Sequence, residues 1–151
     1  MLTSIPIVML LRQTCEKIAP RQLKFPKILI LEDDASTADV ITKWLTMSNY
    51  HCRAERNTSD IIQLAAAYRP DLVIMDYLLP DINGGELCSQ LKSDVQTKDL
   101  PVIICSAYPK VLWSLGSYGS DAFIAKPFDL NDLTTKIEAL LSHAADTRIL
   151  S

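Results

Sequence analysis

The sequence predicts an α/β fold, in which a doubly wound parallel sheet of five strands carries five helices on its two faces. Three short runs, 28–31, 72–75 and 102–105, are apolar at every position. Runs of this kind are typical of strands that are buried on both faces. Segments with helical apolar spacing lie between them, and such alternation indicates a parallel sheet with right-handed crossovers.

The remaining elements follow from shorter or more periodic patterns. An alternating stretch near 51–54 fits a second strand, and the apolar residues 123–125 fit a fifth. Helices are predicted where apolar residues recur three or four positions apart, because this spacing places them on one helical face. The four stronger patterns are Val40, Ile41, Trp44, Leu45; Ile61, Ile62, Ala65, Ala66; Leu87, Cys88, Leu91; and Leu130, Leu133, Ile137, Leu141, and a weaker one covers 109–117.

Polar residues mark where three of these helices begin. We expect Thr58 or Ser59 to cap the helix that contains Ile61, because a hydroxyl can accept a hydrogen bond from a free N–H of the first turn. Asn83 has capping-box spacing to the glutamate three residues later, and Asp129 is the expected N-cap of the last helix.

The elements define one domain over residues 27–142, between an extension of residues 1–26 and a tail of residues 143–151. The extension has apolar residues at helical spacing, which predicts an amphipathic helix. We favour packing of this helix on the domain or on a second copy of the chain over contact with a membrane surface, because its polar face is only moderately basic. Only ten residues follow Leu141, so we expect a stand-alone domain with no output module behind it.

Composition and charge limit the function. The chain has 151 residues, of which 48% are hydrophobic and 22% charged, as in ordered globular proteins. Residues 1–27 carry a net charge of +4 and residues 28–151 a net charge of −7. An acidic domain is a poor candidate for direct nucleic-acid binding.

Cysteine usage and hydropathy bear on the location of the chain. The four cysteines lack the spacing of a metal site, and Cys88 and Cys105 stand in apolar patterns that indicate reduced core thiols. No stretch reaches the roughly 18 apolar residues of a membrane span. The expected location is therefore the cytoplasm.

Four of the apolar runs end in polar groups. In a parallel sheet the carboxyl ends of the strands lie along one edge, and ligands bind there. The polar groups should therefore converge on one small pocket. They are Glu32, Asp33 and Asp34 after the first run, Asp76 after 72–75, Ser106 after 102–105, and Lys126 after 123–125.

These residue types suit phosphoryl transfer, which depends mostly on positioning and charge stabilisation. Asp76 supplies a nucleophile. Glu32 and Asp33 supply acids for Mg²⁺, which prefers oxygen ligands and usually takes one or two protein carboxylates. Lys126 offers a point charge to the phosphoryl oxygens, and the hydroxyl of Ser106 can donate a hydrogen bond to one of them.

The polar groups belong to a longer set of ordered motifs. The acidic pair is followed by Asp76 with Leu79-Pro80 and Asn83-Gly84, then by Ser106-Ala107, and then by Lys126-Pro127-Phe128. The separations are 43 residues from Asp33 to Asp76, 30 to Ser106 and 20 to Lys126. Over residues 28–141 this set resembles the receiver domain of two-component response regulators. The resemblance implies a flavodoxin-like sheet with strand order 2-1-3-4-5.

The resemblance also implies roles for the acidic residues. Asp76 would accept a phosphoryl group from a histidine kinase or a phosphotransfer protein. Mg²⁺ would be bound by Asp76, by Asp33 directly, by Glu32 through water and by the backbone carbonyl of Leu78. Asp34 would be the loop residue that follows the acidic pair. The protein would modify itself in an Mg²⁺-dependent reaction and lose the group slowly, so it would be a switch and not an enzyme.

The remaining implied roles concern the output of the switch. Ser106 and Lys126 would contact the phosphoryl group, and Phe123 occupies the position of a switch aromatic residue. A downstream target would bind the face formed by the fourth helix, the fifth strand and the fifth helix, and a homodimer is the other assembly that we consider. The aromatic residues in or beside that face are Tyr108, Trp113 and Tyr118.

Two other functions are compatible with the same fold. A phosphorylation-independent adaptor would not need the acidic pair, Asp76 or Lys126. A hydrolase with an aspartyl nucleophile usually has a second acid two residues after the nucleophile, and Leu78 stands at that position. We therefore favour the phosphorylated receiver over both alternatives.

Overall fold

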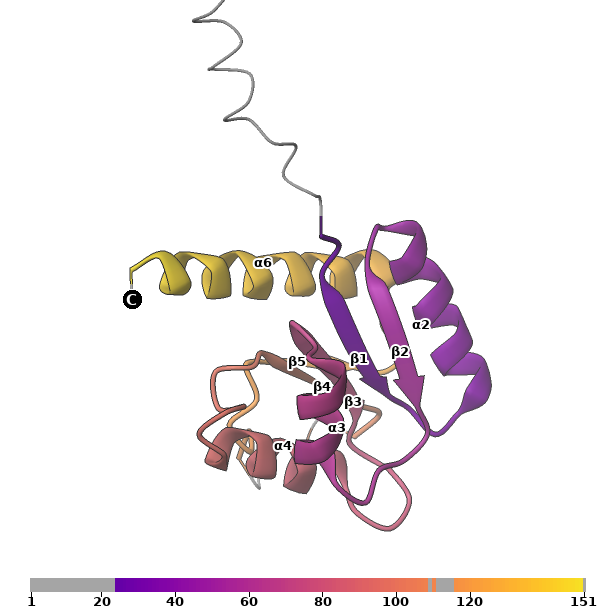
Figure 1. Cartoon of the computed structure of the whole chain (residues 1–151). Coiled ribbons are helices and arrows are strands. Elements are labelled where there is room, and N and C mark those ends of the chain that lie inside the picture. The colour runs from indigo at the N-terminus through magenta and orange to yellow at the C-terminus, as the bar shows by residue number, and fades with distance from the viewer. Residues whose placement is uncertain (1–23, 109, 111–115, 151) are drawn as a thin grey trace, which may run out of the picture.

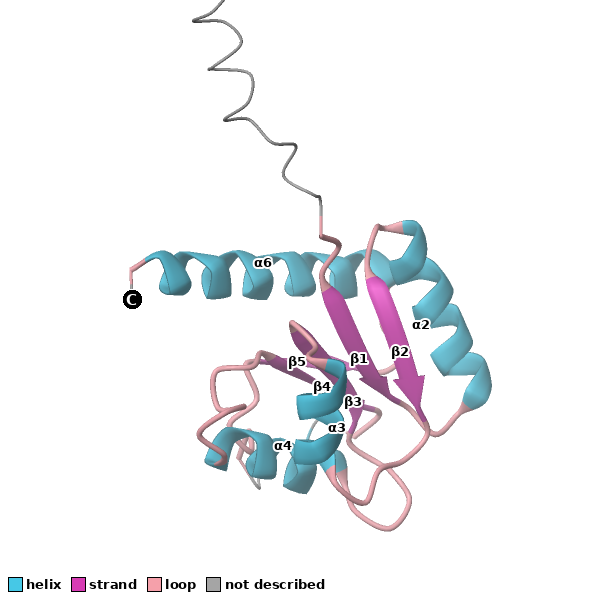
Figure 2. Ribbon diagram, viewed as in Figure 1, coloured by secondary structure: helices cyan, strands magenta, loops and turns pink. Residues whose placement is uncertain are grey.

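The computed structural model describes residues 24–108, 110 and 116–150, which form a parallel sheet with helices on both faces (Figures 1 and 2). Strand order is β2-β1-β3-β4-β5, and every neighbouring pair is parallel. The predicted fold class, the five strands and their order are confirmed. The described elements are β1 (Lys27–Leu31), α2 (Ala35–Met47), β2 (His51–Glu55), α3 (Ile61–Tyr68), β3 (Leu72–Asp76), α4 (Gly84–Ser93), β4 (Val102–Ser106), β5 (Ala122–Ala125) and α6 (Leu130–Ile149).

The described part of the chain contains four of the five predicted helices, and the helix predicted over 109–117 lies largely outside it. Asn83 and Asp129 cap α4 and α6 as predicted. For α3 the prediction of Thr58 or Ser59 is wrong, because the N-cap is Asp60, whose side chain accepts a hydrogen bond from the Gln63 N–H. A carboxylate directly before the first helical residue satisfies that N–H as well as a hydroxyl does.

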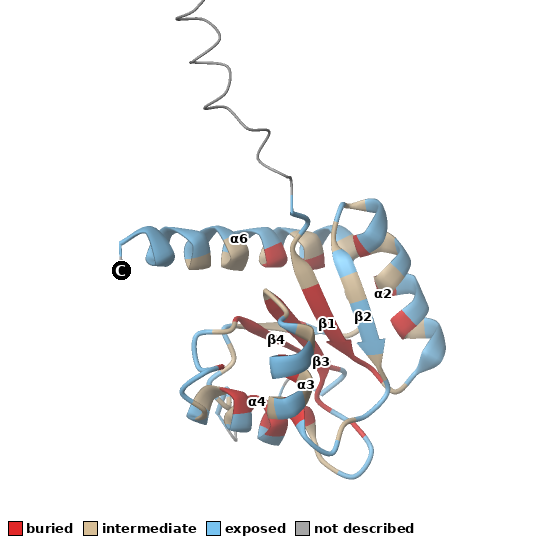
Figure 3. Cartoon of the chain, viewed as in Figure 1, coloured by how far each residue is buried: buried red, intermediate tan, exposed pale blue. Residues whose placement is uncertain are grey.

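The sheet separates two apolar layers, and its central strands are buried along almost their whole length (Figure 3). Side chains of β1, β3, β4 and β5 pack with Ile41 and Leu45 of α2 and with Leu133 and Ile137 of α6 on one face. On the other face, alternate residues of β1, β3 and β4 pack with α3 and α4. This two-sided burial explains why three of the strands are continuous apolar runs.

Helix α6 is longer than the sequence pattern indicated. It continues to Ile149, past the boundary that we set at 142, so most of the tail belongs to the last helix. The apolar pattern stops at Leu141, but good helix formers such as Ala144 and Ala145 follow and no proline or glycine interrupts them. Among the described helices, none combines the length and the apolar character that crossing a membrane requires.

Candidate functional site

The sheet brings the predicted polar residues to one edge. β1 and β3 are neighbours, and Leu31 lies opposite Met75. Glu32 and Asp76, which follow these two residues in the chain, therefore lie at the same level of the sheet. β4 and β5 end beside each other, with Ser106 opposite Ala125. The carboxyl ends of four strands thus place these residues at the same edge of the sheet.

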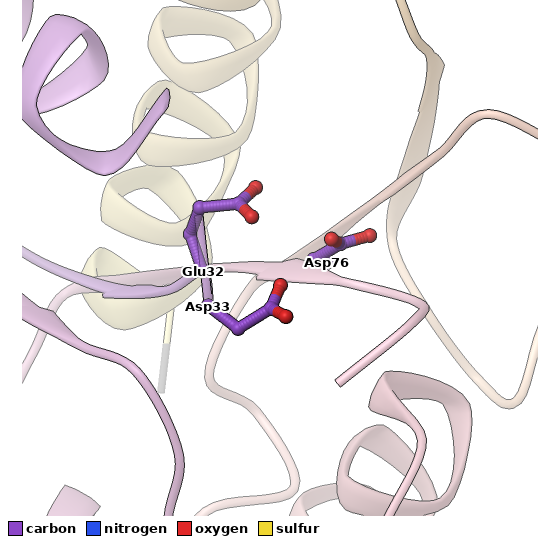
Figure 4. Close-up of side chains that lie close together, drawn as sticks. All are labelled: Glu32, Asp33 and Asp76. Carbon is purple, nitrogen blue, oxygen red and sulfur yellow. The ribbon is translucent and has the colours of Figure 1, made fainter. Parts of the chain in front are cut away.

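Three carboxylates form the centre of this edge (Figure 4). Glu32, Asp33 and Asp76 each place one oxygen within 4.8 Å of the others. Glu32 and Asp76 are only 3% and 9% exposed, and Asp33 is half-buried. Acidic side chains are rarely this buried unless they are paired or bind a metal.

Lys126 pairs with two of these acids. Its Nζ lies 2.7 Å from Glu32 Oε2 and 3.1 Å from Asp76 Oδ2. The backbone N–H of Lys126 donates to the carbonyl of Ser106 at 2.8 Å, which anchors the residue to the end of β4. The ammonium group is therefore directed at the carboxylate that the sequence marks as the nucleophile.

The environment shifts two of these pKa values. Burial, the strongest influence, raises the pKa of Glu32, although hydrogen bonds from Lys126 and from the Asp34 N–H act in the opposite direction. Burial alone would lower the pKa of Lys126, but its hydrogen bonds to Glu32 and Asp76 and their charges outweigh it and raise this pKa. Lys126 therefore stays cationic at neutral pH.

The donor set fits a divalent cation of the magnesium type. The three carboxyl groups count −3 and the Lys126 ammonium +1 in formal charge, so the cluster has a formal excess of two negative charges. All the side-chain donors are hard oxygens, which Mg²⁺ prefers. The Leu78 N–H donates to Asp76 Oδ1 at 3.2 Å, so the backbone of residue 78 also lies beside the nucleophile.

Two of the predicted residues make other contacts. The Oγ of Ser106, which is fully buried, accepts a hydrogen bond from the Tyr108 N–H at 3.0 Å. Asp34 caps α2, and its Oδ1 accepts hydrogen bonds from Ser36 and Thr37, each at 2.7 Å. These bonds lower the pKa of Asp34 to about 2, and its carboxylate is engaged as the cap of α2. The loop role that the sequence suggested for Asp34 is the one the geometry favours.

Phe123 lies on the face of β5 that packs with α3 and α4. It is half-buried against the apolar layer that contains Ile104 and Leu87. Tyr108, two residues after Ser106, is 59% exposed. Trp113 lies outside the described residues.

The structure gives Gly84 and Tyr118 packing roles that the sequence did not predict. A Cβ at Gly84 would overlap the carbonyl oxygen of Asp76, so only glycine allows α4 to begin this close to β3. Tyr118, which the sequence placed in or beside the output face, packs on Gly85 and contacts Tyr77. The glycines at the start of a helix were the available signal, because glycine there indicates a close approach of another group.

Two curated proteins are similar to the chain over most of its length. The chain is 37% identical to the response regulator ArlR of Staphylococcus aureus over 119 residues, which cover 76% of this chain and 52% of that protein. It is 30% identical over 118 residues to the DNA-binding dual master transcriptional regulator RpaA of Synechocystis, covering 77% of this chain and 49% of that protein. The chain thus spans about half the length of these curated relatives.

A solved structure shares both fold and sequence with the chain. It is the signal receiver domain of a signal transduction histidine kinase from Syntrophus aciditrophicus, with a TM-score of 0.71 and 33% identity over 78% of this chain and 91% of that chain. The sequence model of the family described as the response regulator receiver domain matches residues 28–138. The chain therefore belongs to the response regulator receiver domain family.

Proposed function

We propose that the chain is a phosphorylation switch in which Asp76 accepts a phosphoryl group from the phosphohistidine of a histidine kinase or a phosphotransfer protein. One observation carries the proposal. The Asp76 carboxylate lies within ion-pair distance of Lys126 and within 4.8 Å of two further carboxylates. This arrangement combines a nucleophile, a cation and a set of metal ligands in one pocket.

The transfer step can be written on these residues. An Oδ of Asp76 attacks the phosphorus, the P–N bond to the donor imidazole breaks, and the imidazole keeps the electron pair. The product is an acyl phosphate on Asp76 and a free histidine. Lys126 has its Nζ 3.1 Å from Asp76 Oδ2, so it is placed to stabilise the negative charge of the incoming phosphoryl oxygens.

Glu32, Asp33, Asp76 and the carbonyl of Leu78 would hold Mg²⁺, which supplies further positive charge to the phosphoryl oxygens when it is bound. Of the three acids after β1, Asp33 is the proposed direct ligand, because it is half-buried and has no pairing contact to Lys126 of the kind that Glu32 has. Glu32 would act through water while it keeps its ion pair.

Ser106 and Phe123 would convert phosphorylation into a change of surface. The phosphoryl group adds roughly 1.5 to 2 negative charges and new acceptor oxygens. The Ser106 hydroxyl would leave the Tyr108 N–H to donate to one of these oxygens, and Phe123 would move inward behind it. The changed surface would be the face that the sequence assigns to the predicted fourth helix, β5 and α6, and we propose that a downstream target protein or a second copy of the chain contacts it.

The partners that we propose are proteins. The chain from residue 28 onward has an excess of acids over bases, which disfavours direct binding to nucleic acid. The described cysteines are free thiols, and free thiols suit the reducing cytoplasm. The kinase and the downstream target of the chain would therefore both bind it in the cytoplasm.

The test is incubation with acetyl phosphate and Mg²⁺, followed by intact mass spectrometry and a phosphate assay. A gain of one phosphoryl group that disappears slowly supports the switch. No gain in mass and no phosphate release would favour the adaptor instead. Steady release of phosphate without accumulation would show a hydrolase.

We expect Leu78→Asn to speed the loss of the phosphoryl group by roughly tenfold, the equivalent of about 1.4 kcal/mol of barrier. Hydrolysis needs a water aligned behind the phosphorus, and an amide can orient one where Leu78 cannot. The side chains of Leu78 and Tyr108 are 51% and 59% exposed, so either can be changed without opening the core. The measurement is the decay of phosphorylated protein after removal of acetyl phosphate, and an unchanged or slower decay would contradict the expectation.

A further inference from the structure

Two tyrosines connect the loop after Asp76 to the segment that precedes β5. The hydroxyl oxygens of Tyr77 and Tyr118 are 3.3 Å apart, and the ring centroids are 6.0 Å apart at an interplanar angle of 43°. Tyr77 is only 8% exposed, and buried tyrosine hydroxyls usually have a hydrogen-bond partner. Tyr118 provides that partner from a distance of 41 residues along the chain.

The ring of Tyr118 packs directly against Gly85. A Cβ at Gly85 would lie 2.6–2.8 Å from three carbons of that ring, so the first turn of α4 accommodates the ring only because residue 85 is glycine. Tyr118 also has φ of +53°, a conformation that is unfavourable for a residue with a Cβ. Tyr118 and Gly119, with φ of +80°, form the turn that the Ser120 N–H closes on the Ser117 carbonyl at 2.8 Å, and this turn sets the backbone from which the Tyr118 ring reaches Gly85 and Tyr77.

Tyr77 in turn holds the backbone around the nucleophile. Its N–H donates to the carbonyl of Cys105 at 2.8 Å, and its carbonyl accepts from the Gly84 N–H, also at 2.8 Å. Tyr77 thus ties the end of β3 both to β4 and to the start of α4. The residue before it is Asp76 and the residue after it is Leu78, which are the two contributors of this loop to the proposed metal and phosphoryl site.

We infer that Tyr118 is a positioning residue for the phosphoacceptor loop. Through the hydroxyl of Tyr77 and the first turn of α4, it holds residues 76–85 in the arrangement that sets the Asp76 carboxylate and the Leu78 carbonyl for Mg²⁺ binding and phosphoryl transfer. This inference rests on the proposed function. Tyr118 also connects the phosphoacceptor loop to the segment that runs from Ser106 to Lys126, the two residues that we propose to contact the phosphoryl group.

The test is Tyr118→Phe, which keeps the ring on Gly85 and removes only the hydroxyl contact. We expect Mg²⁺ to bind roughly three- to tenfold more weakly to the unphosphorylated protein, the range that corresponds to one neutral hydrogen bond. Calorimetric titration with MgCl₂ measures this directly and does not depend on phosphorylation. With acetyl phosphate, the maximal rate at saturating Mg²⁺ should recover toward that of the wild type, while the Mg²⁺ concentration for half-maximal rate rises.

Tyr68→Phe is the matched control. The Tyr68 hydroxyl donates to the His51 carbonyl at 3.0 Å, so this variant also loses one tyrosine hydrogen bond, but away from the phosphoacceptor loop. It should bind Mg²⁺ as the wild type does. Equal Mg²⁺ affinity in Tyr118→Phe and Tyr68→Phe would overturn the positioning role, even if both variants are less stable.

A double-mutant cycle between residues 85 and 118 provides an independent measurement. Gly85→Ala should displace the Tyr118 ring and weaken Mg²⁺ binding in the wild-type background, but have little further effect in a Tyr118→Ala background. Additive effects on Mg²⁺ affinity would overturn the positioning role of Tyr118. A wild-type protein that neither binds Mg²⁺ nor gains a phosphoryl group would instead refute the proposed function, so the two failures are distinguishable.

Discussion

Asp76→Asn will abolish the uptake of a phosphoryl group from acetyl phosphate. The amide keeps the shape of the side chain and can still accept the hydrogen bond that the Leu78 N–H donates to Asp76 Oδ1. It lacks the nucleophilic carboxylate, and it removes one of the three acids that converge on the site. Intact mass spectrometry after incubation with Mg²⁺ measures the result, and we expect no phosphorylated species at a time when the wild type is fully converted.

The matched control is Asp34→Asn. Asp34 lies next to the acidic pair in sequence, but its carboxylate caps α2 and is bonded to Ser36 and Thr37. Asp34→Asn should be phosphorylated at nearly the wild-type rate. Chelation of Mg²⁺ with EDTA should stop the reaction in Asp34→Asn and in the wild type alike. Phosphorylation of Asp76→Asn at the wild-type rate would assign the phosphoacceptor to another residue.

Gly84→Ala will lower the free energy of unfolding by roughly 2–3 kcal/mol, the upper part of the range for forced overpacking. The added methyl group would overlap the carbonyl oxygen of Asp76, which is backbone and cannot rotate away as a side chain could. The start of α4 must retreat from β3, and the hydrogen bond from the Gly84 N–H to the Tyr77 carbonyl must lengthen. Urea denaturation measures the loss of stability, and slower phosphorylation should accompany it.

Gly116→Ala separates this clash from the general cost of replacing a glycine. Gly116 has φ of +85°, and among the residues that the structure describes none has an atom within 4 Å of an added Cβ. The substitution should therefore cost only about 1 kcal/mol, from the left-handed backbone conformation. If Gly84→Ala proves no more destabilising than Gly116→Ala, the close approach of α4 to Asp76 is not a structural requirement.

The local sequence predicted the strands well, because a strand that is buried on both faces is a continuous apolar run. The runs at β1, β3 and β4 are apolar throughout, and the structure buries them between two helical layers. The local sequence predicted the ends of the helices less well, because these depend on the path of the backbone. The cap of α3 went to Asp60, and α6 continued to Ile149 beyond the last apolar residue of its stripe.

The sequence by itself determined the family, the sheet and the identity of the residues at the strand ends, since residue type and order along the chain carry that information. Only the tertiary structure decided which of these residues meet. It paired Lys126 with both Glu32 and Asp76, used Asp34 as the N-cap of α2, and placed Tyr118 on Gly85 beside Tyr77. The physical reason is that a side chain's partner depends on register, backbone dihedrals and close packing between segments far apart in the chain, and no local pattern of residues encodes these.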